Sequence, residues 1–98
     1  MFLVVCYDIV DDRRRNRLYR KMRDFLPRVQ KSVFEGPISD TRFLLLVAMI
    51  KNEIDHQTDT VRIYQLCARC IYAIEIIGTG NWIDPEPVSY THLRAHET

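Results

Sequence analysis

The chain has 98 residues, of which 47% are hydrophobic and 28% are charged. This composition is ordinary for a folded chain and argues against intrinsic disorder, and the length allows one small domain with a modest core. No apolar run is long enough to cross a bilayer and no signal peptide is recognisable, so we expect a cytoplasmic protein without a membrane partner. The formal net charge is only +1, but nine of the fourteen Lys and Arg residues lie between Arg13 and Lys31 (positions 13, 14, 15, 17, 20, 21, 23, 28 and 31). Positive charge is therefore concentrated in one segment.

Residues 2–9 form a nearly unbroken apolar run rich in β-branched and aromatic side chains, which predicts a central strand covered on both faces. Strand alternation places Asp8 on the same side as Val4 and Cys6, at the carboxyl end of this strand. An ionised carboxylate at the end of a buried strand needs a cation or hydrogen-bond donors. Asp8 is therefore a candidate site residue. The alternative is that it only receives backbone N–H groups or pairs with a neighbouring arginine.

A helix is predicted next, capped by Asp11 or Asp12 and extending to about Leu26, where a proline follows. Arg15 falls within the apolar sector of this helix but in its first turn, so it should point toward the strand end that carries Asp8. Most of the other basic residues should form a solvated face. The apolar stripe of the helix consists of Leu18, Tyr19, Met22, Phe25 and Leu26.

Residues 28–35 are predicted to be extended, and a kink would turn them into a hairpin. A second helix should begin at Ser39 or Asp40, followed by strands at 60–66 and 71–78. With the hairpin, the order becomes βαββαβ, which predicts an α+β ferredoxin-like sandwich with two helices on one face of an antiparallel sheet. The domain is assigned to residues 1–87. The core stripe of the second helix consists of Phe43, Leu46, Val47, Ile50 and Ile54.

Residues 88–98, "VSYTHLRAHET", are polar and without periodicity, and they match one reading frame of a transposase-type sequencing adapter. We hypothesise that this segment is not native and exclude it from functional reasoning. It supplies His92 and His96, which with Cys67 and Cys70 resemble a zinc-binding set, although the inner spacing exceeds that of a zinc finger. We favour a simple turn with two thiols; a metal site shared between two chains is the alternative.

A lone carboxylate suits Mg²⁺, which keeps most of its waters and accepts one or two carboxylates together with phosphate oxygens. A twofold dimer would bring two Asp8 side chains to one cleft, where the metal could activate water against a phosphodiester. Arg15, Arg17 and Arg28 are suited to hold the phosphates. Phe34 is either a core residue or an exposed aromatic ring on which a base could stack.

Four segments together resemble the CRISPR-associated Cas2 family: "YDI" (7–9), "DDRRRNRL" (11–18), "RVQKSVFEG" (28–36) and "TVRIYQLCARC" (60–70). The resemblance runs in the same order from residue 1 to about residue 78. It implies a ferredoxin-like homodimer of CRISPR adaptive immunity that takes part in spacer acquisition. It also implies a Mg²⁺-dependent endonuclease acting on RNA or double-stranded DNA, and a bridge between dimers of the Cas1 integrase.

Carried over by position, Asp8 matches the family's metal-binding aspartate, and Arg15, Arg17, Arg28 and Phe34 match residues linked to nuclease activity. Two alternatives remain open: a non-catalytic DNA-binding bridge between integrase dimers, and a stand-alone ferredoxin-like toxin ribonuclease. The basic residues expected to contact nucleic acid are Arg13, Arg14, Arg15, Arg17, Arg28 and Lys31.

Overall fold

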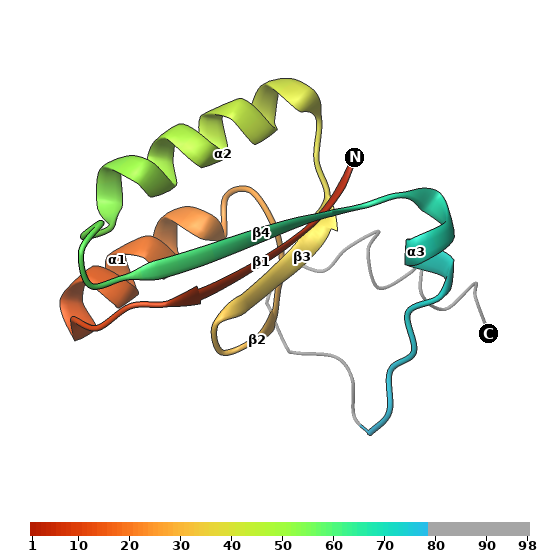
Figure 1. Cartoon of the computed structure of the whole chain (residues 1–98), viewed down its shortest axis with the longest axis horizontal. Coiled ribbons are helices and arrows are strands. Elements are labelled where there is room, and N and C mark those ends of the chain that lie inside the picture. Colours follow the sequence, from red (N-terminus) through yellow and green to blue (C-terminus); the bar gives the residue numbers. More distant parts are fainter. Residues whose placement is uncertain (79–98) are drawn as a thin grey trace.

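The computed structural model describes residues 1–78, and the last part of the assigned domain and residues 88–98 lie outside the described residues. Within this part of the chain, four strands form one antiparallel sheet in the order β2-β3-β1-β4. Helices α1 and α2 lie together on one face of the sheet (Figure 1). The predicted ferredoxin-like βαββαβ arrangement is confirmed. The elements are β1 (Phe2–Asp8), α1 (Asp12–Met22), β2 (Arg28–Gln30), β3 (Val33–Pro37), α2 (Asp40–Glu53), β4 (Thr60–Leu66) and α3 (Ala68–Tyr72).

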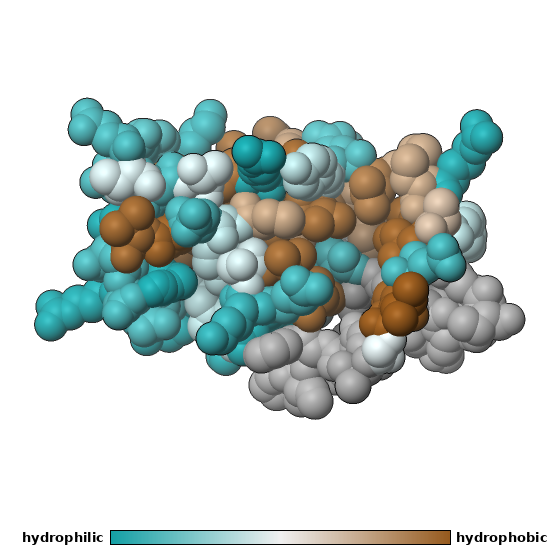
Figure 2. Space-filling view, turned by 60° about the horizontal axis from the view of Figure 1, so that its bottom comes forward, coloured by the Kyte–Doolittle hydropathy of each residue, from teal (hydrophilic) through white to brown (hydrophobic). Residues whose placement is uncertain are grey.

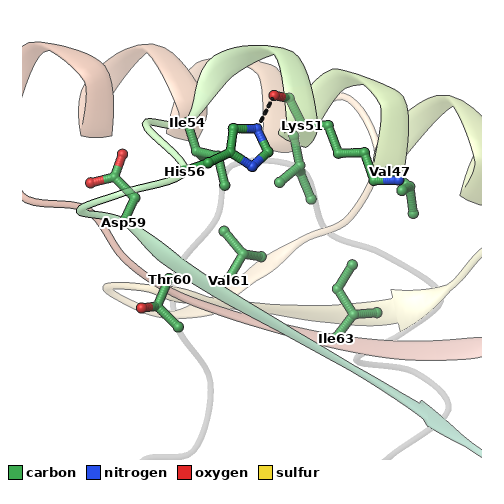
Figure 3. A pocket seen from close by; sticks show the side chains of 9 residues that line it. Val47, Lys51, Ile54, His56, Asp59, Thr60, Val61 and Ile63 are labelled. Atoms are coloured by element: carbon green, nitrogen blue, oxygen red, sulfur yellow. Dashed lines mark hydrogen bonds between the residues drawn. The ribbon is translucent and has the colours of Figure 1, made fainter.

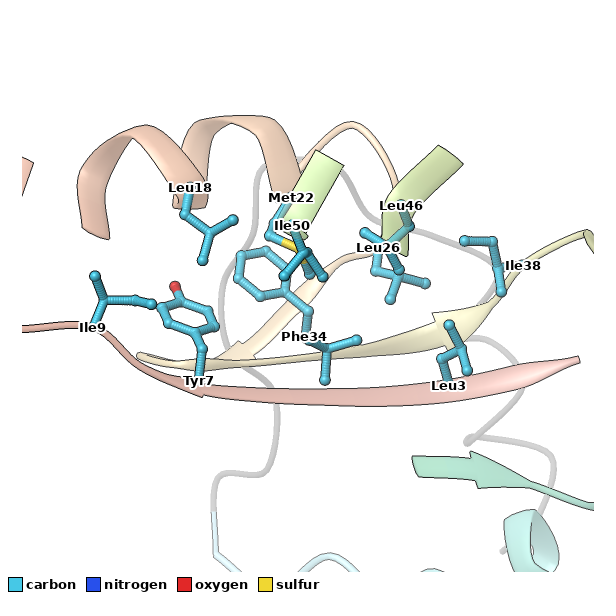
Figure 4. Packing of buried hydrophobic residues seen from close by; sticks show 11 residues of the cluster. Leu3, Tyr7, Ile9, Leu18, Met22, Leu26, Phe34, Ile38, Leu46 and Ile50 are labelled. Carbon is cyan, nitrogen blue, oxygen red and sulfur yellow. The ribbon is translucent and has the colours of Figure 1, made fainter. Parts of the chain in front are cut away.

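The core lies between the sheet and the two helices. Tyr7, Leu3 and Phe34 extend from the strands toward Leu18 of α1 and Ile50 of α2 (Figure 4). Removing these side chains from water is the main contribution to the stability of such a domain. Most residues of the two apolar helix stripes predicted from the sequence belong to this core or pack against it. The buried cluster consists of Leu3, Val5, Tyr7, Ile9, Leu18, Met22, Leu26, Phe34, Ile38, Leu46 and Ile50.

Helix α1 begins as predicted and ends earlier than predicted. The side chain of Asp11 caps the helix by accepting a hydrogen bond from the backbone N–H of Arg14 at 2.8 Å. The helix ends at Met22 rather than near Leu26, where the chain changes to tighter i→i−3 hydrogen bonds: the backbone N–H groups of Asp24 and Phe25 donate to the carbonyls of Lys21 and Met22. Leu26 still reaches the core, so the predicted stripe is intact although the helix is shorter.

Residues 28–37 form the hairpin that the sequence allowed, with β2 and β3 joined by a turn at Lys31 and Ser32. In the register of the sheet, Phe34 lies opposite Val5 and faces the helices. Ser39 caps α2 by accepting a hydrogen bond from the backbone N–H of Arg42 at 3.2 Å. Both of these predictions are confirmed.

The strand predicted at residues 71–78 is wrong. Ala68–Tyr72 forms the short helix α3, and residues 73–78 form no strand. On its outer side β4 is an edge of the described sheet, so the chain leaving it meets no strand with which to pair. A helical turn instead satisfies backbone groups locally, as in the hydrogen bond from Ile71 N–H to the Cys67 carbonyl at 3.1 Å.

The expectation that both faces of β1 are covered is met only in part within the described chain. Leu3, Val5 and Tyr7 are buried beneath the helices and Phe2 is buried on the opposite face, whereas Cys6 on that second face is half-buried and Asp8 is exposed. Both helices lie on the same face of the sheet, so the second face has no helical cover (Figure 1). Asp8 therefore lies at the exposed end of the second face of β1, whereas Phe2 at the other end of that face is buried.

Candidate functional site

A cleft of about 560 Å³ opens where β1 ends, beside the first turns of α1 and the turn between β2 and β3. It contains three of the residues that the sequence analysis singled out, Asp8, Arg15 and Arg28. Lys31, predicted only as a nucleic-acid contact, lines it as well. Among the lining residues Asp8 is the one carboxylate. The lining consists of Tyr7, Asp8, Ile9, Arg15, Asn16, Tyr19, Arg28, Lys31 and Ser32.

The end of β1 is tied to the turn between β2 and β3. The backbone N–H of Tyr7 donates to the Ser32 carbonyl at 3.1 Å, and the Tyr7 hydroxyl donates to the Lys31 carbonyl at 3.4 Å. Burial raises the pKa of the Tyr7 phenol, so this hydroxyl stays protonated and acts as a donor at neutral pH. Asp8 follows directly, so its backbone position at the mouth of the cleft is fixed by these contacts.

Aromatic rings form the base of the cleft and orient Arg28. The Arg28 guanidinium lies 4.2 Å from the centroid of the Tyr19 ring, a cation–π contact. Tyr19 lies 5.9 Å from the Phe34 ring, and Tyr7 stacks on the same ring at 6.1 Å. Phe34 is fully buried, so its role as a core residue is confirmed and the exposed base-stacking alternative is wrong. Phe34 supports both tyrosines from below instead.

Arg15 points into the cleft, as its position in the first turn of α1 predicted. Its guanidinium also pairs with Asp12 on the same turn. The side chain of Asp12 is 86% exposed, so water screens this pair and the attraction between the two groups is weak. A phosphate in the cleft can therefore compete with Asp12 for the Arg15 guanidinium.

The structure places Arg17 outside the cleft, where it contacts α2. Its Nε donates to Glu53 Oε1 at 2.8 Å, and Lys21 pairs with the other oxygen of the same carboxylate. These hydrogen bonds, first that from Lys21 and then that from Arg17, lower the pKa of Glu53. The predicted nuclease role of Arg17 therefore gains no support from proximity to Asp8.

Arg14 is held in a similar way, by the buried Asp59 in the loop before β4. Its Nε lies 2.6 Å from Asp59 Oδ2, and Asp59 also accepts from the backbone N–H groups of Val10 and Asp55 at 3.0 and 2.9 Å. The hydrogen bond from Arg14 holds the pKa of Asp59 well below its usual range. Of the predicted nucleic-acid contacts on α1, Arg13 is exposed to solvent.

Sequence reasoning missed Asp59 and Glu53. The predicted topology did contain a signal for Asp59, because it pairs the first strand with residues 60–66 and so brings residue 59 close to Val10. No comparable signal exists for Glu53. Its contact with Arg17 depends on how closely the two helices lie on the sheet.

A second hollow, of about 340 Å³, lies between α2 and β4 (Figure 3). Val47, Ile54 and Val61 contribute to a largely apolar lining, and His56 Nε2 lies 2.8 Å from the Lys51 carbonyl. The carboxylate at its rim, Asp59, is already bound by Arg14. This hollow contains none of the residues that the sequence analysis predicted for the metal or the nuclease reaction, so the cleft at Asp8 is the candidate site.

Within residues 1–78 no three His, Cys, Asp or Glu side chains lie close enough together to hold a metal ion. His92 and His96 lie outside the described residues, so the zinc-like set from the sequence is not tested. Cys67 and Cys70 are free thiols at the start of α3. The described helices also include none that is long and apolar enough to cross a membrane.

Fold and cleft together define a small ferredoxin-like protein whose first strand presents one carboxylate among several cations. The sequence model of the family described as "CRISPR associated protein Cas2" matches residues 1–74. The chain belongs to this Cas2 family, as the four sequence segments indicated.

Two relatives illustrate the similarity. A protein of Chloroflexus aurantiacus named CRISPR-associated endoribonuclease Cas2 1 is 38% identical over 81 residues, which cover 82% of this chain and 87% of the relative. CRISPR-associated endoribonuclease Cas2 2 of Methanospirillum hungatei is 41% identical over 76 residues, covering 78% and 84% of the two chains.

Solved structures agree in fold. The crystal structure of Streptococcus pyogenes Cas2 at pH 6.5 superposes with a TM-score of 0.70 at 28% identity, covering 80% of this chain and all of the other (100%). A hypothetical protein, TT1823 from Thermus thermophilus, gives a TM-score of 0.72 at 31% identity, covering 83% and 94%. The ferredoxin-like core described above is therefore the fold of solved Cas2 structures.

Proposed function

We propose that this protein is a Mg²⁺-dependent endoribonuclease of CRISPR adaptive immunity that works during spacer acquisition in the cytoplasm. The observation that carries this proposal is the cleft itself, in which Asp8 shares one lining with Arg15, Arg28 and Lys31. Three cations around one carboxylate suit a phosphodiester, whose negative charge increases in the transition state. The names of the relatives, which are endoribonucleases, support the same assignment.

The residues present fit a weakly held Mg²⁺ better than a tightly enclosed metal. Asp8 is exposed, and it supplies the only carboxylate of the cleft lining. Mg²⁺ tolerates such a site because it keeps several waters and takes its remaining ligands from substrate phosphates. When bound beside Asp8, the ion would supply an activated water and neutralise charge on the phosphodiester.

The protein side chains would hold and orient the substrate. Arg28 is fixed over Tyr19 and presents a planar guanidinium suited to two phosphate oxygens. Arg15 can exchange its screened contact with Asp12 for a phosphate. Lys31 adds a further positive charge on the turn between β2 and β3. The contacts proposed here all go to phosphates, so we expect little dependence on RNA sequence.

We propose a homodimer formed through the face of the sheet that lies opposite α1 and α2. The register puts Val4 opposite Tyr64 on this face, and Tyr64 is 47% exposed. Figure 2 turns the side away from α1 and α2 toward the viewer and shows hydrophobic residues gathered along the middle of the molecule. A twofold dimer through this face would bring the Asp8 side chains of two copies closer together, and a second Asp8 would complete a two-carboxylate site.

A second candidate function is a non-catalytic bridge that holds duplex DNA and dimers of the Cas1 integrase. The observation in its favour is the excess of cations over metal ligands: Arg13 and Arg20 are exposed on α1, whereas the cleft has one carboxylate. Such a surface would bind DNA through phosphates, with strong salt dependence and no sequence preference. A ribonuclease that acts without an integrase is a third possibility.

The deciding experiment compares wild type with Asp8→Ala on single-stranded RNA and duplex DNA, with Mg²⁺ and with EDTA. We expect Mg²⁺-dependent RNA cleavage that falls at least about 100-fold in Asp8→Ala, roughly 2.7 kcal/mol of transition-state stabilisation. Asp24→Asn, which alters an exposed acid beyond the end of α1, is the matched control and should cleave normally.

Light scattering should give the dimer mass for all three proteins. Undiminished cleavage by Asp8→Ala would assign the activity to a contaminant or to another site. Salt-dependent DNA binding without any cleavage by the wild type would favour the bridge.

A further inference from the structure

Two cysteines lie at the end of β4, in a part of the molecule that the proposed function does not use. Cys67 and Cys70 are both exposed, and their Sγ atoms are 3.5 Å apart. Leu66, the residue before them, pairs with Phe2 at the start of β1, whereas Asp8 is at the other end of the same strand. The thiol pair and the cleft therefore lie at opposite ends of the sheet.

The local backbone holds the two thiols together. Cys67 is the N-cap residue of α3 and Cys70 lies in its first turn, where the backbone N–H of Ile71 donates to the Cys67 carbonyl at 3.1 Å. A disulfide bond needs a sulfur separation of roughly 2.0 Å, so rotation of the two side chains can close the remaining gap without moving another element. Both cysteines are exposed, so a small reagent has access to the pair.

We propose that Cys67 and Cys70 form a redox-active dithiol that exchanges with small-molecule disulfides of the glutathione class and closes to an intramolecular disulfide. The pair is a modification site separate from the cleft. Cys6, the remaining cysteine, is half-buried on β1 and has no second thiol beside it in the described structure.

The exchange takes place in two steps. The Cys67 thiolate attacks one sulfur of the small disulfide, whose S–S bond breaks and releases one small thiol. The Cys70 thiolate then attacks Cys67 Sγ in this mixed disulfide, forms the protein disulfide and releases the second small thiol. Two electrons pass from the protein dithiol to the small disulfide, and the two thiol protons end on the released thiols.

The surroundings of the two sulfurs favour this order of attack. Hydrogen bonds from Cys70, first from its backbone N–H and then from its thiol, lower the pKa of Cys67. The same side-chain contact raises the pKa of Cys70. Cys67 is therefore the more readily ionised thiol and the natural first nucleophile, and Cys70 is the resolving thiol.

Chelation of a soft metal ion is the main competing use of such a pair. Two thiolates supply half of a tetrahedral site, and the described residues place no third His, Cys, Asp or Glu beside them to form a cluster. Disulfide exchange needs only the two sulfurs that the structure brings together. The observations therefore favour the redox reaction.

The test uses the full chain, fully reduced and then equilibrated in mixtures of reduced and oxidised glutathione. Samples are acid-quenched, and free thiols are alkylated with N-ethylmaleimide. Trypsin cleaves after Arg69, so a Cys67–Cys70 bond joins two peptides that mass spectrometry detects as one linked species. We expect this species to form at ratios that leave Cys6 alkylated, and to be unchanged in Cys6→Ser.

Cys70→Ser is the informative variant, because it should stop the exchange at the mixed disulfide and leave glutathione on Cys67. The reverse variant, Cys67→Ser, should react more slowly. The proposal is overturned if wild type accumulates glutathione on both cysteines without the internal bond, or forms bonds between chains instead. It is also overturned if the purified chain protects both thiols with bound zinc that a chelator removes.

Discussion

Two groups of cations on and around α1 differ in what holds them. Arg14, Arg17 and Lys21, the held cations, are bound by carboxylates of other elements: Asp59 in the loop before β4 and Glu53 at the end of α2. By contrast, the cleft cations line the cavity beside Asp8; they are Arg15, Arg28 and Lys31. Arg14 and Arg15, which are adjacent in the basic segment, thus differ in role, because a carboxylate in the loop before β4 holds Arg14 whereas Arg15 lines the cleft.

This difference decides which cations of a basic segment are available to bind nucleic acid. A held cation is paired with a carboxylate that is itself buried, so binding a phosphate would leave that carboxylate without its partner. A cation that lies over an aromatic ring, as Arg28 lies over Tyr19, is oriented by that contact. Charge density along the sequence alone therefore overstates the nucleic-acid surface of α1.

The largest expected effect is the loss of stability when Phe34, the ring beneath the two tyrosines of the cleft, is removed. Phe34→Ala should lower the free energy of unfolding by about 3–5 kcal/mol, because it opens a cavity beneath Tyr7 and Tyr19. Urea denaturation measures this loss. Phe34→Leu keeps most of the volume and should fold, yet bind RNA more weakly because Tyr19 and Arg28 lose their flat support. Wild-type RNA affinity in folded Phe34→Leu would contradict the link between the core ring and the cleft.

The direct test of the comparison is Arg28→Ala against Arg17→Ala. Arg28→Ala should weaken binding of single-stranded RNA about tenfold, or roughly 1.4 kcal/mol. It should also reduce the slope of log binding constant against log salt concentration by about 0.7, because one phosphate contact is lost. Arg17→Ala should change affinity by less than about twofold, since its guanidinium is bound to Glu53. Fluorescence anisotropy in EDTA at several salt concentrations measures both. Equal losses in the two variants would remove the distinction between the groups.

A smaller effect should appear as a pH dependence of stability. The pKa of Asp59 is lowered in the folded protein, first of all by the hydrogen bond from Arg14, whereas in the unfolded chain it is near the usual value of about 3.9. Asp59 therefore contributes stability above that value, and the contribution is lost as the pH falls toward the folded-state pKa. Asp59→Asn should melt below wild type at neutral pH, and the difference should shrink below about pH 4. A constant difference from neutral pH to pH 3 would contradict this linkage.

The smallest expected effect is that of Glu53→Gln. It removes one carboxylate from two partly exposed cations, Arg17 and Lys21, so the loss of stability should be only about 0.5–1 kcal/mol. Thermal unfolding at low and high salt checks the value, and high salt should reduce the difference from wild type. RNA affinity should not fall, and a large drop would place the held cations in the binding surface after all.

Much of the fold was predictable because local patterns report local structure. The apolar, β-branched run at residues 2–9 predicted β1, the segment 60–66 was predicted as the strand that is β4, and the caps at Asp11 and Ser39 predicted the starts of α1 and α2. The apolar run at 71–78 misled for a physical reason. A strand needs a neighbouring strand to satisfy its backbone, and a sequence window contains no information on whether one is present.

The features of the candidate site also divide into those that the sequence predicted and those that only the tertiary structure shows. The sequence by itself determined that Asp8 ends the first strand and that Arg15 points toward it, because strand alternation and helix phase fix these directions within a few residues. Only the tertiary structure decided that Phe34 is buried, that Arg28 lies on Tyr19, and which other cations are held. Arg17 and Glu53 are 36 residues apart in the chain, and Arg14 and Asp59 are 45 apart. Such contacts form only when the helices and the loop before β4 pack against the same sheet. The local periodicity of the sequence therefore does not predict them.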